Sequence, residues 1–156
     1  MKRRPILRVL RGTLRHLELM LPLFRSYLEF YHVPASVPAA RRFLRARLRR
    51  GDSQVYLAFL GDSPVGFMQL YPTFSSLAMR PAWLLSDLFV APTGRRRGVA
   101  TALLQRAHRL GETTGAAELA LETARTNHPA QRLYAGLGWC RDDKFLVYRR
   151  TCRRRK

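Results

Sequence analysis

The residues best suited to chemistry form a basic, glycine-containing turn in the second half of the chain. Arg95, Arg96 and Arg97 are followed directly by Gly98 and by small residues that begin a helical pattern. A turn at the start of a helix presents free backbone N–H groups and the positive end of the helix dipole, and both favour a bound phosphate. Gly98 lets the backbone approach that anion without a Cβ in the way. The turn therefore predicts a pyrophosphate site, although it matches neither a Walker loop nor the dinucleotide-binding glycine pattern.

Two strands and two helices have to position this turn. Residues 83–90 are apolar enough for a mostly buried strand, and the turn 91–94 separates that strand from the basic cluster. A short strand of alternating polarity, Glu118 to Thr123, follows the first helical pattern. The segment Asn127–Trp139 then predicts a second helix, with Pro129 in its first turn.

Two of these stretches resemble the signatures of the GNAT acetyltransferases. Arg95-x-x-Gly98-x-Ala100 matches the pattern [QR]-x-x-G-x-[GA], and residues 127–139 match N-x-x-A-x-x-[LF]-Y-x-x-x-G-[FYW] at every named position. The chain is identified as a member of this superfamily on these matches. Within it, the chain most resembles a small branch that includes yeast histone- and polyamine-acetylating enzymes, on the segments FRSYLEFY (24–31) and SDLFV (86–90).

The resemblance implies a mixed α/β (α+β) GNAT fold in a single domain over residues 1–156: a twisted sheet of six to seven strands flanked by about four helices. The residue patterns agree in outline. They predict strands at 6–10, 54–60, 65–71, 83–90, 118–121 and 144–149, and helices at 12–31, 38–49, 98–111 and 129–137. Ser36 is placed to cap the second helix, Pro22 lies inside the first, and residues 72–81 are expected to form a loop.

The resemblance also implies the cofactor. GNAT enzymes pass an acetyl group directly from acetyl-CoA to an amine, and coenzyme A leaves as the product. The family's V-shaped gap would lie between the strand ending at Val90 and the strand 119–121, with backbone groups of Leu88, Phe89 and Val90 facing the pantetheine arm and the thioester oxygen. Further cofactor contacts are expected from Arg95, Arg96, Arg97, Gly98, Val99, Ala100, Thr101, Asn127, Ala130 and Tyr134.

Amide formation from a thioester needs an acid and a base. An aliphatic ammonium has a pKa of about 10 and must lose a proton, and the leaving thiolate benefits from gaining one. The resemblance gives the acid role to Tyr134. Ser86 stands where many relatives carry a glutamate, so we take Asp87 as the catalytic carboxylate, reached through water. A backbone carbonyl is the alternative, and Glu29 and Glu122 are other carboxylates that the fold could bring near.

The acceptor side of the family lies under the first helix and the loop before the central strand. Aromatic residues there could hold an ammonium by cation–π contacts, although aromatic residues at helical spacing are also typical of a hydrophobic core. The residues expected to shape this acceptor pocket are Tyr27, Tyr31, Tyr71, Phe74 and Trp83.

The net charge of +19 bears on the choice of acceptor. Such a field attracts anions, coenzyme A among them, and opposes the approach of polycations. We therefore expect a small-molecule amine, although the yeast-branch likeness favours a protein or polyamine amine. Two other classes stay open. A nucleic-acid module lacks an aromatic stacking platform here, and a non-catalytic acyl-CoA-binding protein is favoured by Ser86 but not by Tyr134 and Asn127.

The remaining expectations concern location and assembly. Cys140 and Cys152 are typical of reduced thiols in a cytoplasmic protein, and no apolar run is long enough to cross a membrane. No histidine or cysteine spacing is typical of a metal site. A single last strand would leave the sheet with an open edge, so a homodimer is expected.

Overall fold

A five-stranded sheet organises the larger part of the chain in the computed structural model, which describes residues 5–152. The strands lie in chain order and neighbours pair antiparallel, except that the last pair is parallel. The described residues therefore form five strands, and our expectation of six to seven is wrong. The strands are β1 (Leu7–Arg11), β2 (Gln54–Leu60), β3 (Ser63–Ser75), β4 (Arg80–Val90) and β5 (Leu119–Leu121).

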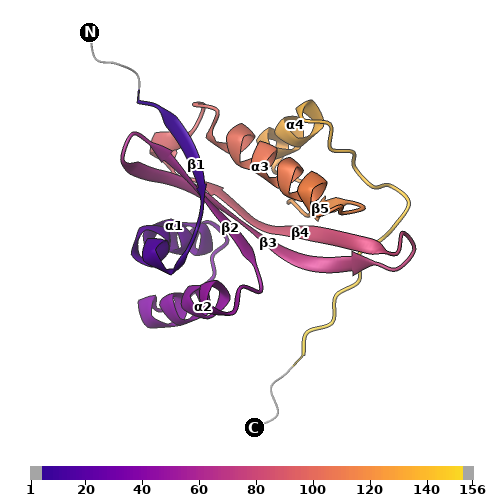
Figure 1. Ribbon diagram of the computed structural model, residues 1–156, viewed down its shortest axis with the longest axis horizontal. Helices are drawn as coiled ribbons and strands as arrows, with labels where there is room; N and C mark the ends of the chain where they lie inside the picture. Colours follow the sequence, from indigo (N-terminus) through magenta and orange to yellow (C-terminus); the bar gives the residue numbers. More distant parts are fainter. Residues whose placement is uncertain (1–4, 153–156) are drawn as a thin grey trace. The chain divides into compact units, whose positions relative to one another are not determined.

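The chain forms two compact units, which divide between Glu122 and Thr123. In the first unit, helices α1 (Leu17–Phe30) and α2 (Val37–Arg50) lie on one face of the sheet and α3 (Val99–Thr113) lies on the other (Figure 1). The second unit contains α4 (His128–Gly136). The four expected helices are thus confirmed.

Local signals at α2 are also confirmed. Ser36 caps the helix, because its hydroxyl accepts the backbone N–H of Ala39 at 3.3 Å. The helix ends at Gly51, which adopts the left-handed conformation with φ 64°. In α1, a short 3₁₀ turn at Leu14–His16 precedes the helix, and Pro22 lies inside it without ending it.

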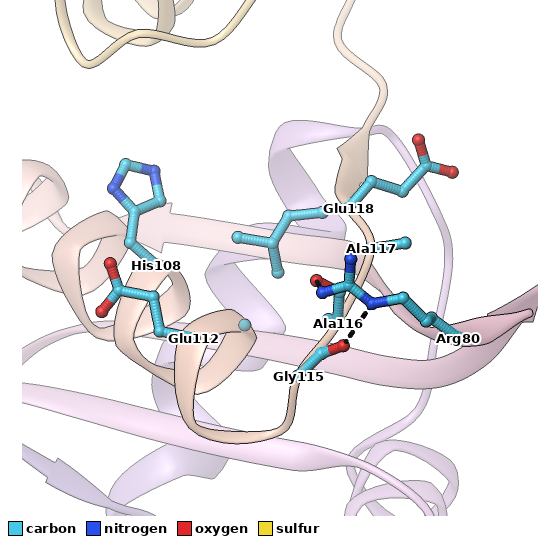
Figure 2. A pocket seen from close by; sticks show the side chains of 9 residues that line it. Arg80, His108, Glu112, Gly115, Ala116, Ala117 and Glu118 are labelled. Carbon is cyan, nitrogen blue, oxygen red and sulfur yellow. Dashed lines mark hydrogen bonds between the residues drawn. The ribbon is translucent and has the colours of Figure 1, made fainter. Parts of the chain in front are cut away.

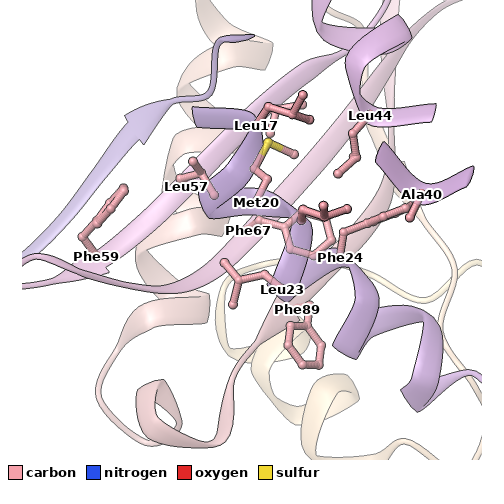
Figure 3. Close-up of a cluster of buried hydrophobic side chains, with 12 residues drawn as sticks. Leu17, Met20, Leu23, Phe24, Ala40, Leu44, Leu57, Phe59, Phe67 and Phe89 are labelled. Atoms are coloured by element: carbon pink, nitrogen blue, oxygen red, sulfur yellow. The ribbon is translucent and has the colours of Figure 1, made fainter. Parts of the chain in front are cut away.

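The core lies between the sheet and the pair α1 and α2 (Figure 3). Met20, Leu44, Leu57 and Phe67 are fully buried. The ring of Phe24 meets the ring of Phe67 edge to face, with centroids 6.0 Å apart. Burying an apolar side chain of this size contributes about 1.5–3 kcal/mol, so this cluster fixes α1 and α2 firmly over the strands that carry the site.

The segment 72–81, expected as a loop, instead extends the β3–β4 hairpin. Pairing continues outward from Pro72 opposite Trp83 to Ser75 opposite Arg80. The prolines and serines of this segment are typical of turns, but cross-strand pairing overrides that local preference. The tip of the hairpin exposes Leu77, which is 98% accessible.

The predicted strand at 144–149 is not formed. The segment has no strand pairing, and its apolar side chains are strongly exposed: Phe145 75%, Leu146 78%, Val147 63% and Tyr148 87%. Its composition favours a strand, but a strand also needs a partner edge. The end of the expected tail, residues 153–156, lies outside the described residues.

Candidate functional site

Strand β4 carries a β-bulge at Ser86. Asp87 lies opposite Gln69 of β3, whereas Leu85 lies opposite the next residue, Leu70. Ser86 is therefore an extra residue without a partner in the β3–β4 pairing. A bulge of this kind shifts the alternation of side chains, so that odd-numbered residues before and after it point to opposite faces.

Contacts on the two faces agree with this shift. Before the bulge, the indole N–H of Trp83 donates to the hydroxyl of Thr114, just beyond the end of α3, at 2.9 Å. After the bulge, the ring of Phe89 lies 6.5 Å from the rings of Tyr27 and Phe67, on the α1 side. The bulge thus turns Asp87 toward α1.

Asp87 lies in a buried hydrogen-bond network. Asp87 is only 8% exposed. The amide Nε2 of Gln69 donates to Oδ2 of Asp87 at 2.8 Å, and Oε1 of Gln69 accepts from the hydroxyl of Ser53 at 2.9 Å. The Tyr27 hydroxyl lies within hydrogen-bonding range of the carboxylate and donates to the backbone carbonyl of Ser86 at 3.4 Å.

Burial shifts the acidity of these groups. It raises the pKa of Asp87 above the ordinary value, and hydrogen bonds from Gln69, Tyr27 and Ser86 oppose that shift. Burial and the nearby Asp87 carboxylate raise the pKa of Tyr71 to about 12, and they raise the pKa of Tyr27 further. Near neutral pH both tyrosines therefore stay protonated, and Asp87 is the group in this network that can accept a proton.

A cavity of about 370 Å³ opens in front of Asp87. Tyr27, Tyr71, Ser86 and Asp87 form its polar wall. An apolar cavity with a few convergent polar groups is typical of a small-molecule site. The apolar lining comes from α1, α2 and the segment before α2: Phe24, Leu28, Ala35, Ala39, Ala40 and Phe43.

Only part of the expected acceptor wall lies at this cavity. Tyr27 and Tyr71 line it. Tyr31 is 48% exposed, and its ring contacts that of Tyr27 with centroids 5.1 Å apart without lining the cavity. Phe74 is 78% exposed on the hairpin, because the expected loop is a strand that extends away from α1. Trp83 faces α3 because of the bulge.

The other carboxylates considered for the base do not line the cavity. Glu29 is exposed and forms an ion pair with Arg25 at 3.9 Å. Glu122 follows the end of β5. Of the three expected carboxylates, Asp87 alone belongs to the cavity wall of the described residues.

The strands β4 and β5 part where the cofactor gap was expected. Their parallel pairing covers only Trp83–Leu85 and Leu119–Leu121. Beyond it, within the described residues, Leu88, Phe89 and Val90 pair with β3 on one side only. This stretch of β4 therefore has a free edge of the kind that a pantetheine arm could join by backbone hydrogen bonds, and the pairing implied by the family resemblance stays a prediction.

The basic turn has the geometry of an anion site. Gly98 is the N-cap of α3 with φ 77°, and it offers no side chain to the helix. The first N–H groups of the helix, at Val99, Ala100 and Thr101, have no partner within the helix. The side chains of residues 95–97 are exposed around this end, and Nε of Arg95 donates to the carbonyl of Val90 at 3.3 Å. Free donors and positive charge fit a pyrophosphate.

The second unit holds the remaining predicted residues. Asn127 caps α4, because its side chain accepts the backbone N–H of Ala130 at 3.4 Å. Tyr134 lies within α4, with its ring 6.1 Å from that of Trp139. The cap contact gives Asn127 a structural role at the start of α4, whereas the cofactor roles of Asn127, Ala130 and Tyr134 stay predictions.

A second cavity, of about 400 Å³, lies where α3 ends and β5 begins (Figure 2). The guanidinium of Arg80 donates to the carbonyls of Gly115 and Ala116, both at 3.1 Å. These bonds tie the start of β4 to the loop before β5. The cavity thus lies at the amino ends of the two parallel strands, away from the bulge and from the start of α3.

The described residues contain no cluster of three or more histidine, cysteine, aspartate or glutamate side chains that could hold a metal ion. In the same part of the chain, no helix has the length and apolar character needed to cross a membrane.

A model of the acetyltransferase (GNAT) family matches residues 20–139. The chain belongs to the GNAT acetyltransferase family. It is 39% identical over 127 residues to the uncharacterized N-acetyltransferase YhfO of Bacillus subtilis (strain 168), a match covering 81% of this chain and 85% of that protein. The crystal structure of a probable acetyltransferase, also 39% identical, has a TM-score of 0.88 and covers 95% of this chain and 99% of its own.

A shorter match concerns an aminoglycoside N(6′)-acetyltransferase type 1 of Salmonella typhimurium. It is 33% identical over 72 residues, which is 46% of this chain and 50% of that enzyme. The protein is thus an N-acetyltransferase, and GNAT acetyltransferases use acetyl-CoA.

Several residues of this acetyltransferase's cavity were missed from the sequence. Phe24 and Phe43 stack with centroids 5.8 Å apart and form part of its wall. Phe43 lies on the same apolar face of α2 as Ala39 and Ala40, and this helical spacing could have predicted that Phe43 lines the cavity. Gln69 has no comparable signal, because its partnership with Asp87 depends on the register of two strands.

Proposed function

We propose that the acetyltransferase moves the acetyl group of acetyl-CoA to a primary amine of a small molecule, with Asp87 as the base. One observation carries the proposal: a buried carboxylate belongs to the polar wall of a mostly apolar cavity, beside the point where β4 and β5 part. A primary amine is the acceptor group that a lone carboxylate suits best, because the carboxylate attracts the ammonium and then takes its proton.

Acetyl-CoA supplies the thioester whose C–S bond breaks as the amide C–N bond forms. Asp87 receives one proton from the bound ammonium, which frees the nitrogen lone pair for attack. The raised pKa of Asp87 makes this carboxylate a stronger base than an exposed one. By the family resemblance, Tyr134 gives its proton to the departing sulfur. The nitrogen loses its second proton as the amide forms, and this proton restores the Tyr134 hydroxyl through solvent. Coenzyme A thus leaves as a thiol, and the proton on Asp87 passes to solvent.

The basic turn would hold the cofactor's pyrophosphate. Arg95, Arg96 and Arg97 supply positive charge, and residues 98–101 supply backbone N–H groups at the start of α3. Gly98 contributes its positive φ, a conformation that other residues rarely adopt. Backbone groups of residues 88–90 would pair with the pantetheine arm along the free edge of β4.

The cavity supports a small acceptor. Its volume of about 370 Å³ lies in the range of small-ligand sites. The net charge of +19 opposes polycations at long range. The similarity to an aminoglycoside N(6′)-acetyltransferase favours a small-molecule amine as well. The aromatic rings of Tyr27 and Tyr71 would stabilise the ammonium beside Asp87.

A protein or polyamine amine is the second candidate acceptor, favoured by the yeast-branch segments at 24–31 and 86–90. We infer further that the enzyme is a cytoplasmic homodimer. The free, exposed Cys140 and Cys152 favour a reducing compartment.

An acceptor screen scored by release of free thiol from acetyl-CoA tests this function. The panel contains small monoamines, an aminoglycoside, spermidine and a histone-tail peptide, each at low and at physiological salt. We expect a small monoamine to be best, and we expect salt to improve the multiply charged acceptors (the aminoglycoside, spermidine and the peptide) more than the monoamines, because ions screen the repulsion. If spermidine or the peptide is best at low salt, the small-molecule assignment is wrong. If no amine of the panel releases thiol although acetyl-CoA binds, acetyl transfer to these amine classes is excluded and the proposed acceptor is wrong.

A further inference from the structure

Three polar residues are buried within the described part of the chain, and they form one connected network. Ser53 is 7% exposed, Gln69 is fully buried, and Asp87 is 8% exposed. Ser53 lies just before β2, Gln69 lies in β3 and Asp87 lies in β4. Buried polar groups are costly unless they are paired, and here each is paired with the next.

The network has a fixed direction. An ionised carboxylate can only accept hydrogen bonds, so Gln69 has to turn its Nε2 toward Asp87. The amide oxygen of Gln69 then faces Ser53, and the Ser53 hydroxyl satisfies it as a donor. The opposite orientation of the amide would place its oxygen against a carboxylate oxygen, which is repulsive.

We propose that Gln69 and Ser53 are positioning residues for the catalytic carboxylate: they hold Oδ2 of Asp87 and leave its other oxygen to the acceptor amine. The proposal rests on the proposed function, in which Asp87 is the base. Tyr27 and Ser86 also bond the carboxylate, and both line the acceptor cavity. Gln69 does not line it, so the amide acts through Asp87 alone.

The surroundings make the amide important for the charge of Asp87. The groups that face the carboxylate are Tyr27 from α1, Ser86 from its own strand, and Gln69 and Tyr71 from β3. The ion pair of Arg47 with Asp52, at 3.1 Å, acts on Tyr71. Within the described residues, Asp87 has no ion pair, so hydrogen-bond donors stabilise its ionised form, and Gln69 is the donor with the 2.8 Å bond.

The test is the pH profile of kcat/KM for Gln69→Met, a variant that keeps the shape of the side chain but removes its donor. Loss of a hydrogen bond to a charged group raises the pKa of that carboxyl by about 1 unit. The acid limb should therefore move to higher pH, with activity on the limb itself about tenfold lower at a given pH and the plateau at high pH within about threefold of the parent enzyme. Gln105→Met, at an exposed position of α3, should keep the parent profile.

Ser53 gives a second, independent pair of variants. Ser53→Ala should move the acid limb in the same direction by a smaller amount, because it releases Gln69 without removing its donor. Ser53→Thr keeps the hydroxyl and should restore the parent profile. If Gln69→Met and Ser53→Ala both fold and both keep the parental acid limb, the positioning role is wrong.

The failure of this proposal can be told from a failure of the proposed function. If Asp87→Asn keeps parental turnover, Asp87 is not the base and the function as proposed fails. If Asp87→Asn is inactive while Gln69→Met and Ser53→Ala keep the parental acid limb, Asp87 is the base but Gln69 and Ser53 do not position it.

Discussion

At the scale of single residues, Asp87 places a carboxylate where burial disfavours charge. The fold raises the pKa of Asp87, mainly through burial, above the value of about 4 in an unfolded chain. The folded state therefore binds this proton more tightly than the unfolded state does. It follows that the contribution of Asp87 to stability is largest below pH 4 and falls as the pH rises through the raised pKa.

Asp87→Asn should therefore raise the melting temperature at pH 7 and leave it nearly unchanged near pH 3. The amide oxygen of asparagine can still accept from Gln69, so the variant removes the charge without removing that bond. Each 1 kcal/mol gained corresponds to about 2–4 °C for a chain of this size. Thermal unfolding at several pH values measures the difference, with Asp62→Asn at a fully exposed carboxylate as the control. A lower melting temperature for Asp87→Asn at pH 7 would contradict the assignment of burial as the main cause.

Tyr134 is the second residue for which we propose a chemical role. Tyr134→Phe should lower turnover by about 10²- to 10⁴-fold, the range for loss of a positioned acid, with little change in the affinity for acetyl-CoA. Tyr148→Phe removes a hydroxyl from an 87% exposed tyrosine and should leave turnover unchanged. Steady-state kinetics and calorimetry separate the two effects. Near-normal turnover of Tyr134→Phe would leave Tyr134 as a packing residue.

At the scale of elements, the proposed function requires the start of α3 to bind the pyrophosphate of the cofactor. Gly98→Asp should abolish binding of acetyl-CoA, because a carboxylate would meet the pyrophosphate. Gly98→Asn adds a side chain of the same shape without charge, so it should weaken binding less. Gly115, just past the end of α3, has φ 64° and open space around it, and Gly115→Asp is the matched control. Unchanged affinity of Gly98→Asp by calorimetry would remove the turn from the cofactor site.

The elements also show which features the sequence could predict. Helical periodicity and caps predicted α1 to α4 because those signals are local, as at Ser36. The family segments predicted Asp87 and the aromatic Tyr27. The bulge at Ser86 was not predictable, since it exists only in the register of β4 against β3. That register decides that Trp83 faces α3 and that Gln69 contacts Asp87. The sequence therefore could not predict the residues that support Asp87 from behind the cavity wall.

At the scale of the whole molecule, the main features are a high positive charge, an open sheet edge and an exposed apolar segment. The net charge of +19 attracts an anionic cofactor. Among the described residues, β5 pairs with β4 alone, so the sheet ends in an open edge. The segment 145–148 has the composition of a strand and is exposed. Open edges are usually covered or paired in native proteins.

We therefore predict a homodimer in which segment 145–148 of one copy adds to an open sheet edge of the other. Light scattering should give the mass of a dimer, and Val147→Lys should shift the mass toward the monomer. Leu77→Lys makes the same change at the exposed hairpin tip and should leave the dimer intact. A monomer mass that does not depend on protein concentration would count against the dimer.

Acetyl transfer by Asp87→Asn, measured as N-acetylated product with the best amine of the acceptor screen, tests most directly whether Asp87 is the base. The parent enzyme should form the amide, and Asp87→Asn should form it at least about 10²-fold more slowly at neutral pH, the lower end of the range for loss of a positioned base. Its affinity for acetyl-CoA should be unchanged, because the predicted cofactor contacts at residues 88–90 and 95–101 are retained. Parental rates of amide formation by Asp87→Asn would show that the buried carboxylate is not the base.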